Sequence, residues 1–251
     1  MKFSVCIDAV FGKKDCVESI KTVKSLGFEA FEFWAWWNRD LEQIRVAKER
    51  EGLEVAAICT KFISLVDAAG RMEYINGLRE SIAAAKKLGC KKIITQVGNA
   101  IPELEREAQH ESLAEGLREC RRLLESEDIT LLVEPLNTLV DHKGYYLYSS
   151  EEGFQIIDEV GSPKVKLLYD IYHQQIMEGH VIARITENID KIGHFHAAGN
   201  PGRHELDAGE LNYPNIFTAI QKAGYREYLG LEYFPLEDPV QGLRRINGTG
   251  R

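Results

Sequence analysis

The stretch ITLLVE (residues 129–134) is a short apolar run that ends in a carboxylate. Side chains alternate between the two faces of a β-strand, so Thr130, Leu132 and Glu134 share one face. Similar apolar runs with a polar side chain at or near their end are VKLLYD (165–170), IGHFHA (192–197) and YLGLE (228–232). Each of these four strands is therefore expected to bring an acid or an imidazole to its carboxyl end.

On both sides of this stretch the chain alternates short apolar strands with amphipathic helices. The expected strands cover 3–9, 28–34, 53–59, 90–97, 129–134, 165–170, 192–197 and 228–232. The expected helices cover 16–26, 41–50, 72–88, 103–127, 150–160, 174–189, 213–222 and 240–246. Eight βα units in a chain of 251 residues predict a closed (β/α)8 TIM barrel, formed by residues 1–251 as a single domain.

The alternative fold is an open, doubly wound α/β sheet. Such sheets often carry a G-x-G-x-x-G turn or a phosphate-binding loop after a strand, and this sequence has neither. It also lacks a Pro-, Gly- and Ser-rich linker that would divide it into two domains. These features favour one barrel over an open sheet.

Composition excludes several classes of partner. The formal net charge is −8, whereas nucleic-acid binding relies on clustered Lys and Arg, so no nucleic-acid partner is expected. No apolar run approaches the roughly 18 residues of a membrane span. The five cysteines are widely spaced, without a C-x-x-C pair, which indicates neither a disulfide framework nor a thiolate zinc site. The chain starts directly on a strand pattern, so a cytoplasmic location is expected.

Four strand-end residues form the candidate metal site: Glu134, Asp170, His196 and Glu232. Chemistry in a barrel collects at the carboxyl ends of the strands, and three carboxylates meeting there would repel one another without a cation. Oxygen ligands with one imidazole suit one divalent ion, Mn²⁺, Mg²⁺ or Co²⁺. A lone Asp, Glu or His at a strand end is usually a cap or a structural residue; four in register are much harder to explain that way.

Other side chains near the expected barrel mouth are weaker candidates. His194 lies one step deeper than His196 and is interpreted as a structural or supporting group, and Glu32 as a hydrogen-bonded interior carboxylate. The aromatic cluster at 33–37 is expected either to line the site or to form a subunit interface, and Trp34 has the inward parity. Lys61 and Gln96 are weaker candidates for substrate contacts.

Several segments carry a family resemblance: Glu134-Pro135-Leu136-Asn137, the Y-D-I-Y-H-x-Q-x-M-E-G pattern from Tyr169 to Gly179, and the stretches NPGRH (200–204) and GELNY (209–213). The sequence resembles the xylose isomerase-like TIM-barrel superfamily, and within it the hydroxypyruvate isomerase family. The resemblance covers essentially the whole chain and is densest between Glu134 and Glu232.

The resemblance implies a role for individual residues. Glu134, Asp170, His196 and Glu232 correspond to the metal ligands of the family, and Glu134 and Glu232 also to the catalytic pair that moves the proton. His173 and Arg203 correspond to groups that hold substrate oxygens. From the residues alone, His173 could instead cap a helix and Arg203 could be a surface cation.

The implied activity is that of an aldose–ketose type isomerase in carbohydrate metabolism, which converts hydroxypyruvate to tartronate semialdehyde through an enediolate. His196 fits the related ketose 3-epimerases better, because some hydroxypyruvate isomerases have an amide there. Those epimerases carry a further Glu where this chain has Val140. An epimerase or isomerase of a free keto-sugar is therefore the alternative. An endonuclease-type barrel and a non-catalytic barrel subunit are more remote, and a homo-oligomer remains open.

Overall fold

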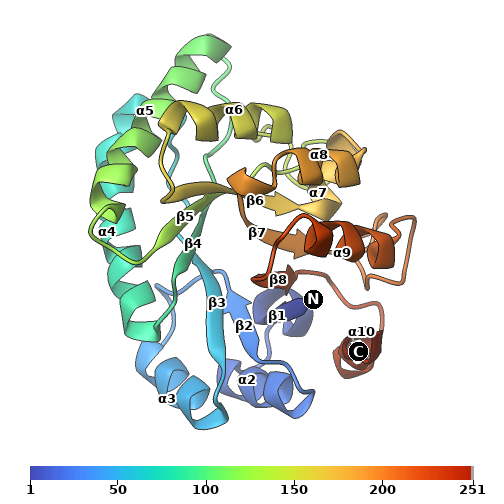
Figure 1. The fold of residues 1–251 in the computed structure, drawn as a ribbon. Helices are drawn as coiled ribbons and strands as arrows, with labels where there is room; N and C mark the ends of the chain where they lie inside the picture. The colour runs from blue at the N-terminus through green and yellow to red at the C-terminus, as the bar shows by residue number, and fades with distance from the viewer. Residues whose placement is uncertain (250–251) are drawn as a thin grey trace.

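Eight parallel strands close into one barrel in the computed structural model, which describes residues 1–249 (Figure 1). Each strand pairs with its neighbours in chain order, and the last pairs with the first. The strands are β1 (Lys2–Cys6), β2 (Ala30–Phe33), β3 (Glu54–Cys59), β4 (Lys92–Thr95), β5 (Thr130–Val133), β6 (Val165–Asp170), β7 (Ile192–Ala197) and β8 (Tyr228–Leu231). The predicted (β/α)8 barrel is confirmed, and the open sheet is excluded because β1 and β8 are paired.

The helices form a ring outside the strands (Figure 1). They are α1 (Ile7–Phe11), α2 (Cys16–Ser25), α3 (Leu41–Glu51), α4 (Arg71–Leu88), α5 (Arg106–Leu124), α6 (Ser150–Val160), α7 (Ile171–Met177), α8 (Val181–Glu187), α9 (Tyr213–Lys222) and α10 (Pro239–Thr249). Two short 3₁₀ turns are η1 (Ala68–Gly70) and η2 (Ile189–Lys191). Within residues 1–249, none of the helices has the length and apolar character to cross a membrane.

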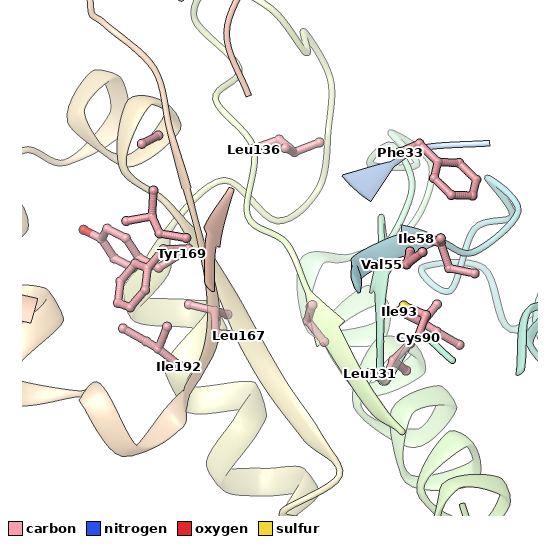
Figure 2. Packing of buried hydrophobic residues seen from close by; sticks show 14 of the residues in the cluster. Phe33, Val55, Ile58, Cys90, Ile93, Leu131, Leu136, Leu167, Tyr169 and Ile192 are labelled. Atoms are coloured by element: carbon pink, nitrogen blue, oxygen red, sulfur yellow. The ribbon is translucent and has the colours of Figure 1, made fainter. Parts of the chain in front are cut away.

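Alternate strand residues enter two different cores. Leu131 and Leu167 belong to the large hydrophobic cluster, which also contains residues of the helices. Figure 2 shows Leu131 near Ile93, and Leu167 near Tyr169 and Ile192. Leu132 and Leu168, their neighbours in sequence, belong to a separate small cluster with Ala57, Cys59 and Ile94. This alternation is the expected consequence of the strand period of two. It gives Glu134 and Asp170 the parity of the smaller cluster, which is the parity expected from the sequence.

Two predicted elements were wrong. The strand expected over 3–9 ends at Cys6, and the chain turns directly into α1. The helix expected over 174–189 is two helices, α7 and α8, because Gly179 and His180 both adopt positive φ, 63° and 53°, which ends a right-handed helix. The last two residues of the domain expected over 1–251 lie outside the described residues, and its single-domain character stays a prediction.

Candidate metal centre and active site

The four predicted ligands come together at the carboxyl ends of consecutive strands. Glu134 directly follows β5, Asp170 ends β6, His196 lies in β7 and Glu232 directly follows β8. One ligand atom from each lies within 4.8 Å of the others. All four residues are at most 4% exposed, so their charges interact in a medium of low polarity.

Asp170 divides its two oxygens between two tasks. Oδ1 accepts the backbone N–H groups of Tyr172 at 2.8 Å and of His173 at 3.2 Å, which caps the N-terminus of α7. Oδ2 is buried and accepts no hydrogen bond. Burial raises the pKa of Asp170 to about 7, with the carboxylates of Glu232 and Glu134 adding to the effect and Arg203 and His196 opposing it. Oδ2 therefore lies among charged groups of both signs, with Nη2 of Arg203 at 3.7 Å.

Glu232 is held from two sides. Nε1 of Trp34 donates a 2.6 Å hydrogen bond to Oε1, and Nη2 of Arg203 donates to Oε2. Burial alone would raise the pKa of Glu232, but the positive fields of His196 and Arg203 outweigh it and hold the pKa well below its usual range. Glu232 is therefore a firmly placed, ionised carboxylate.

His196 lies between carboxylates on both sides of its ring. Nδ1 is 3.3 Å from Oε2 of Glu232 and 3.6 Å from Oε1 of Glu134, while Nε2 is 3.1 Å from Oε1 of Glu32. Burial disfavours a charged imidazole, yet Glu232 and Glu32 overcome it and raise the pKa of His196 well above its usual value. A field that stabilises an imidazolium also stabilises a bound cation.

The donor set fits a divalent metal ion. Oδ2 of Asp170 and Nδ1 of His196 are buried without hydrogen-bond partners, and an unpaired buried polar atom is costly. Three carboxylates and one imidazole are the ligands of hard to borderline divalent ions. These four residues therefore could hold such an ion.

A second buried layer supports this cluster. Glu32, in β2, accepts hydrogen bonds from Nε2 of His194 at 2.9 Å and from Oγ of Ser4 at 3.3 Å. Glu32 is thus a hydrogen-bonded interior carboxylate, as expected, and His194 supports it. Gly230 leaves the necessary space: a Cβ there would overlap Oε1 of Glu32 and lie 2.6 Å from Cδ2 of His196.

The two residues expected to hold substrate occupy different positions. Arg203 lies on the loop after β7 with φ of 58°, a conformation uncommon for a residue with a side chain, and it lines the pocket. His173 is fully buried and is not among the lining residues of the pocket, and its Nε2 lies 3.6 Å from Oδ2 of Asp170. Burial lowers the pKa of His173 well below its usual value, with Arg203 adding to the effect.

A pocket of about 640 Å³ opens above the cluster, and Glu134, Glu232 and Arg203 line it. Its walls include Trp34 from the predicted aromatic cluster, and Gln96 also lines it. Trp36 and Trp37 instead pack edge to face, and Trp37 packs on Phe62. Lys61 forms an ion pair with Glu80 of α4.

Sequence reasoning missed several lining residues, because they lie on loops without strand parity. Among them are Phe62, Ser64, His142, Tyr145 and Phe234. For Tyr145 no local signal exists: its hydroxyl donates to the carbonyl of Glu134 at 3.0 Å and accepts the N–H of Val97 at 2.7 Å.

Comparison with known proteins agrees with this geometry. The sequence profile described as "Xylose isomerase-like TIM barrel" matches residues 20–247. Hydroxypyruvate isomerase of Escherichia coli (strain K12) is 33% identical, with 97% of each chain covered. The 2-oxo-tetronate isomerase of Cupriavidus necator is 28% identical, with 96% of each chain covered. A solved structure named AP endonuclease, family 2, from Brucella melitensis superposes with a TM-score of 0.94 at 27% identity, covering 98% of each chain.

The prediction of an isomerase is confirmed at the level of enzyme class by these near-full-length relatives. The profile match spans most of the chain, and the first relative exceeds 30% identity over nearly all of it. The chain belongs to the xylose isomerase-like TIM barrel family.

Proposed function

We propose that this protein is a metal-dependent isomerase of a small hydroxy-keto acid, of the type that converts hydroxypyruvate to tartronate semialdehyde. The observation that carries the proposal is the pair Glu134 and Glu232. These two buried carboxylates directly follow β5 and β8, and both line the pocket and adjoin His196. Two relatives named for isomerising small hydroxy-keto acids support this substrate class.

Glu134, Asp170, His196 and Glu232 would hold one divalent ion, Mn²⁺, Mg²⁺ or Co²⁺. When bound, such an ion supplies Lewis-acid polarisation of a carbonyl oxygen, worth several kcal/mol of charge stabilisation. Arg203, the cationic side chain among the pocket-lining residues of the described chain, would pair with a substrate oxygen or carboxylate.

The two glutamates differ in their surroundings, and this difference suggests separate roles. Both oxygens of Glu232 receive hydrogen bonds, whereas Glu134 has His196 at 3.6 Å as its nearest ionic neighbour. We assign Glu134 as the base that removes a proton from C3 of the hydroxy-keto acid. The C–H electron pair forms the C2=C3 bond of an enediolate as the C2=O π pair moves onto the C2 oxygen. The proton of the C3 hydroxyl passes to the C2 oxygen, and the carbon-bound proton returns to C2, so that C3 becomes the carbonyl and C2 carries the hydroxyl. A positioned base contributes about 10²–10⁴-fold to such a step.

A free keto-sugar is the second candidate substrate, since a 640 Å³ pocket has room for more than a three-carbon acid. In an epimerase, the proton would return to the opposite face of the same carbon. The endonuclease named for the Brucella structure would need a cationic surface to bind DNA, and this chain carries a net charge of −8. The cytoplasmic location and the oligomeric state stay predictions.

The test is proton exchange in D₂O. The metal-loaded protein is incubated with hydroxypyruvate, 2-oxo-tetronate and free ketoses, and deuterium at carbon is followed by NMR and mass spectrometry. We expect exchange and isomerisation of a keto acid, lost in Glu134→Gln and Glu232→Gln but kept in the exposed control Glu103→Gln. Near-normal turnover in both amide variants would contradict the assignment of Glu134 and Glu232 as the catalytic pair.

A further inference from the structure

Asn137, the last residue of the Glu134-Pro135-Leu136-Asn137 segment, has an amide group of fixed orientation. Its Oδ1 accepts the backbone N–H groups of Val140 and Asp141, each at 3.0 Å. Since Oδ1 is used by two donors, the other amide atom must be the Nδ2 donor group. Nδ2 donates to Oδ2 of Asp141 at 2.7 Å and faces Nδ1 of His173 at 2.6 Å.

This arrangement determines which nitrogen of His173 carries the proton. Nδ1 faces two donors, the Asn137 side chain at 2.6 Å and the Asn137 backbone N–H at 3.3 Å. A nitrogen that accepts from an N–H group cannot carry a proton of its own, so the ring proton lies on Nε2. Hydrogen-bond geometry alone thus selects the neutral Nε2–H tautomer.

The Nε2–H group of His173 has no hydrogen-bond acceptor in the described part of the chain, and it lies beside the candidate metal ligand Asp170. Nε2 is buried, has no hydrogen-bond partner among the described residues, and lies 3.6 Å from Oδ2 of Asp170. That oxygen accepts no hydrogen bond from these residues either, although Nη2 of Arg203 lies 3.7 Å from it. A buried donor left unpaired costs roughly 1–3 kcal/mol. A ligand oxygen beside Asp170 would satisfy this donor.

We propose that Asn137 is a positioning residue that fixes His173 as a neutral Nε2–H donor to the oxygen of the substrate where negative charge develops. The catalytic part of this inference rests on the proposed function, since that oxygen is the carbonyl oxygen that gains charge in the enediolate. A donor that is already oriented stabilises the negative charge of the transition state without having to reorganise during the reaction. An imidazole held in this tautomer acts as an electrophile and not as a base.

The loop around Asn137 is built to keep the amide in place. The N–H of His142 donates to the carbonyl of Asn137 at 3.0 Å, which closes the turn. The hydroxyl of Tyr172 donates to Oδ2 of Asp141 at 2.9 Å, and the ring of His142 packs on that of His173 at 5.3 Å between centroids. A rotation of the amide would place Nδ2 against the N–H groups of Val140 and Asp141, and Oδ1 against Oδ2 of Asp141. Three hydrogen bonds would then be lost whichever tautomer His173 adopts.

The first experiment needs no substrate. Two-bond ¹H–¹⁵N NMR of the Mg²⁺-loaded protein, with His173→Gln to assign the resonances, reports which ring nitrogen is protonated. We expect an unprotonated Nδ1 and a protonated Nε2 in the wild type. In Asn137→Asp combined with Asp141→Asn, a carboxylate faces Nδ1 and can only accept, so Nδ1 becomes protonated. A protonated Nδ1 in the wild type overturns the proposal, and this measurement stands even if the variant does not fold.

The second experiment measures turnover of the substrate identified in D₂O. Against the Asp141→Asn reference, the double variant should lose about 10²–10³-fold in kcat, the cost of one oxyanion donor, with little change in KM. With His173→Ala present as well, the Asn137→Asp change should have no further effect on kcat. An equal loss in the absence of His173 would show that Asn137 does not act through the imidazole. A wild type inactive on every substrate, with the expected tautomer, would reject the proposed function and leave the tautomer assignment standing.

Discussion

Nε1 of Trp34 and Oε1 of Glu232 are joined by a 2.6 Å hydrogen bond that spans 198 positions of the sequence. It crosses from the end of β2 to the end of β8, over β1, which pairs with both. The indole therefore does two things: it forms part of the pocket wall and it holds one oxygen of a candidate catalytic carboxylate.

Replacing Trp34 by Phe keeps the aromatic wall and removes the donor. A hydrogen bond to a charged group contributes about 1.5–3 kcal/mol, so kcat/KM should fall about 10- to 100-fold in steady-state kinetics. Trp36→Phe is the matched control. Nε1 of Trp36 is buried without a hydrogen-bond partner, so this substitution removes no hydrogen bond and should leave the rate nearly unchanged. Equal rates for the two variants would show that the hydrogen bond from Trp34 to Glu232 does not contribute to catalysis.

Gly230→Ala should damage the layer beneath the ligands. The new Cβ would overlap Oε1 of Glu32 and crowd the ring of His196, and overpacking in a core costs about 1–3 kcal/mol. We expect a lower Tm in calorimetry and weaker Mn²⁺ binding in titration calorimetry. Gly77→Ala is the control. Gly77 lies in a helix, and the atom nearest to a new Cβ there is the flexible end of Ile63 at 3.1 Å, so Mn²⁺ affinity should not change. Unchanged Mn²⁺ affinity in Gly230→Ala would contradict the supporting role of this layer.

Divalent metal should stabilise the folded chain, because it offsets the repulsion among Glu134, Asp170 and Glu232. At 100 times its dissociation constant a ligand adds about 2.7 kcal/mol to the free energy of unfolding. Chelation should therefore lower Tm and abolish activity, and Mn²⁺, Mg²⁺ or Co²⁺ should restore both. Asp170→Asn keeps an oxygen to cap α7 but removes the charge, so its Tm should respond far less to metal. A full response in that variant would exclude Asp170 as a ligand.

His110 should make stability depend on pH. Partial burial opposes its charged form, but hydrogen bonds of its ring to Glu159 and Glu152 outweigh that effect and raise the pKa of His110. Because the folded pKa lies above the unfolded one, this contribution is complete below about pH 6.5 and is lost as pH rises through the folded pKa. Between pH 6 and pH 9, Tm should fall more for the wild type than for His110→Gln. Parallel Tm curves would show that the pairs between α5 and α6 contribute no pH-dependent stability.

Sequence alone determined the barrel and the membership of the candidate metal site. Both follow from local rules: the strand period of two aligns Glu134 with Leu132 and Asp170 with Leu168, and eight repeats of strand and helix close a ring. Errors arose where local backbone chemistry departs from periodicity, as at Gly179 and His180, where positive φ breaks the expected helix.

Tertiary structure decided what each site residue touches. Strand parity cannot show that Trp34 donates to Glu232, that Glu32 reaches His194 and His196, or that Asn137 selects the tautomer of His173. Those contacts join loops and strands far apart in the chain, and their geometry depends on barrel closure, on register and on the space left at Gly230. Periodicity is a property of neighbouring residues, whereas the direction of a hydrogen bond is set by the two backbones that the fold brings together.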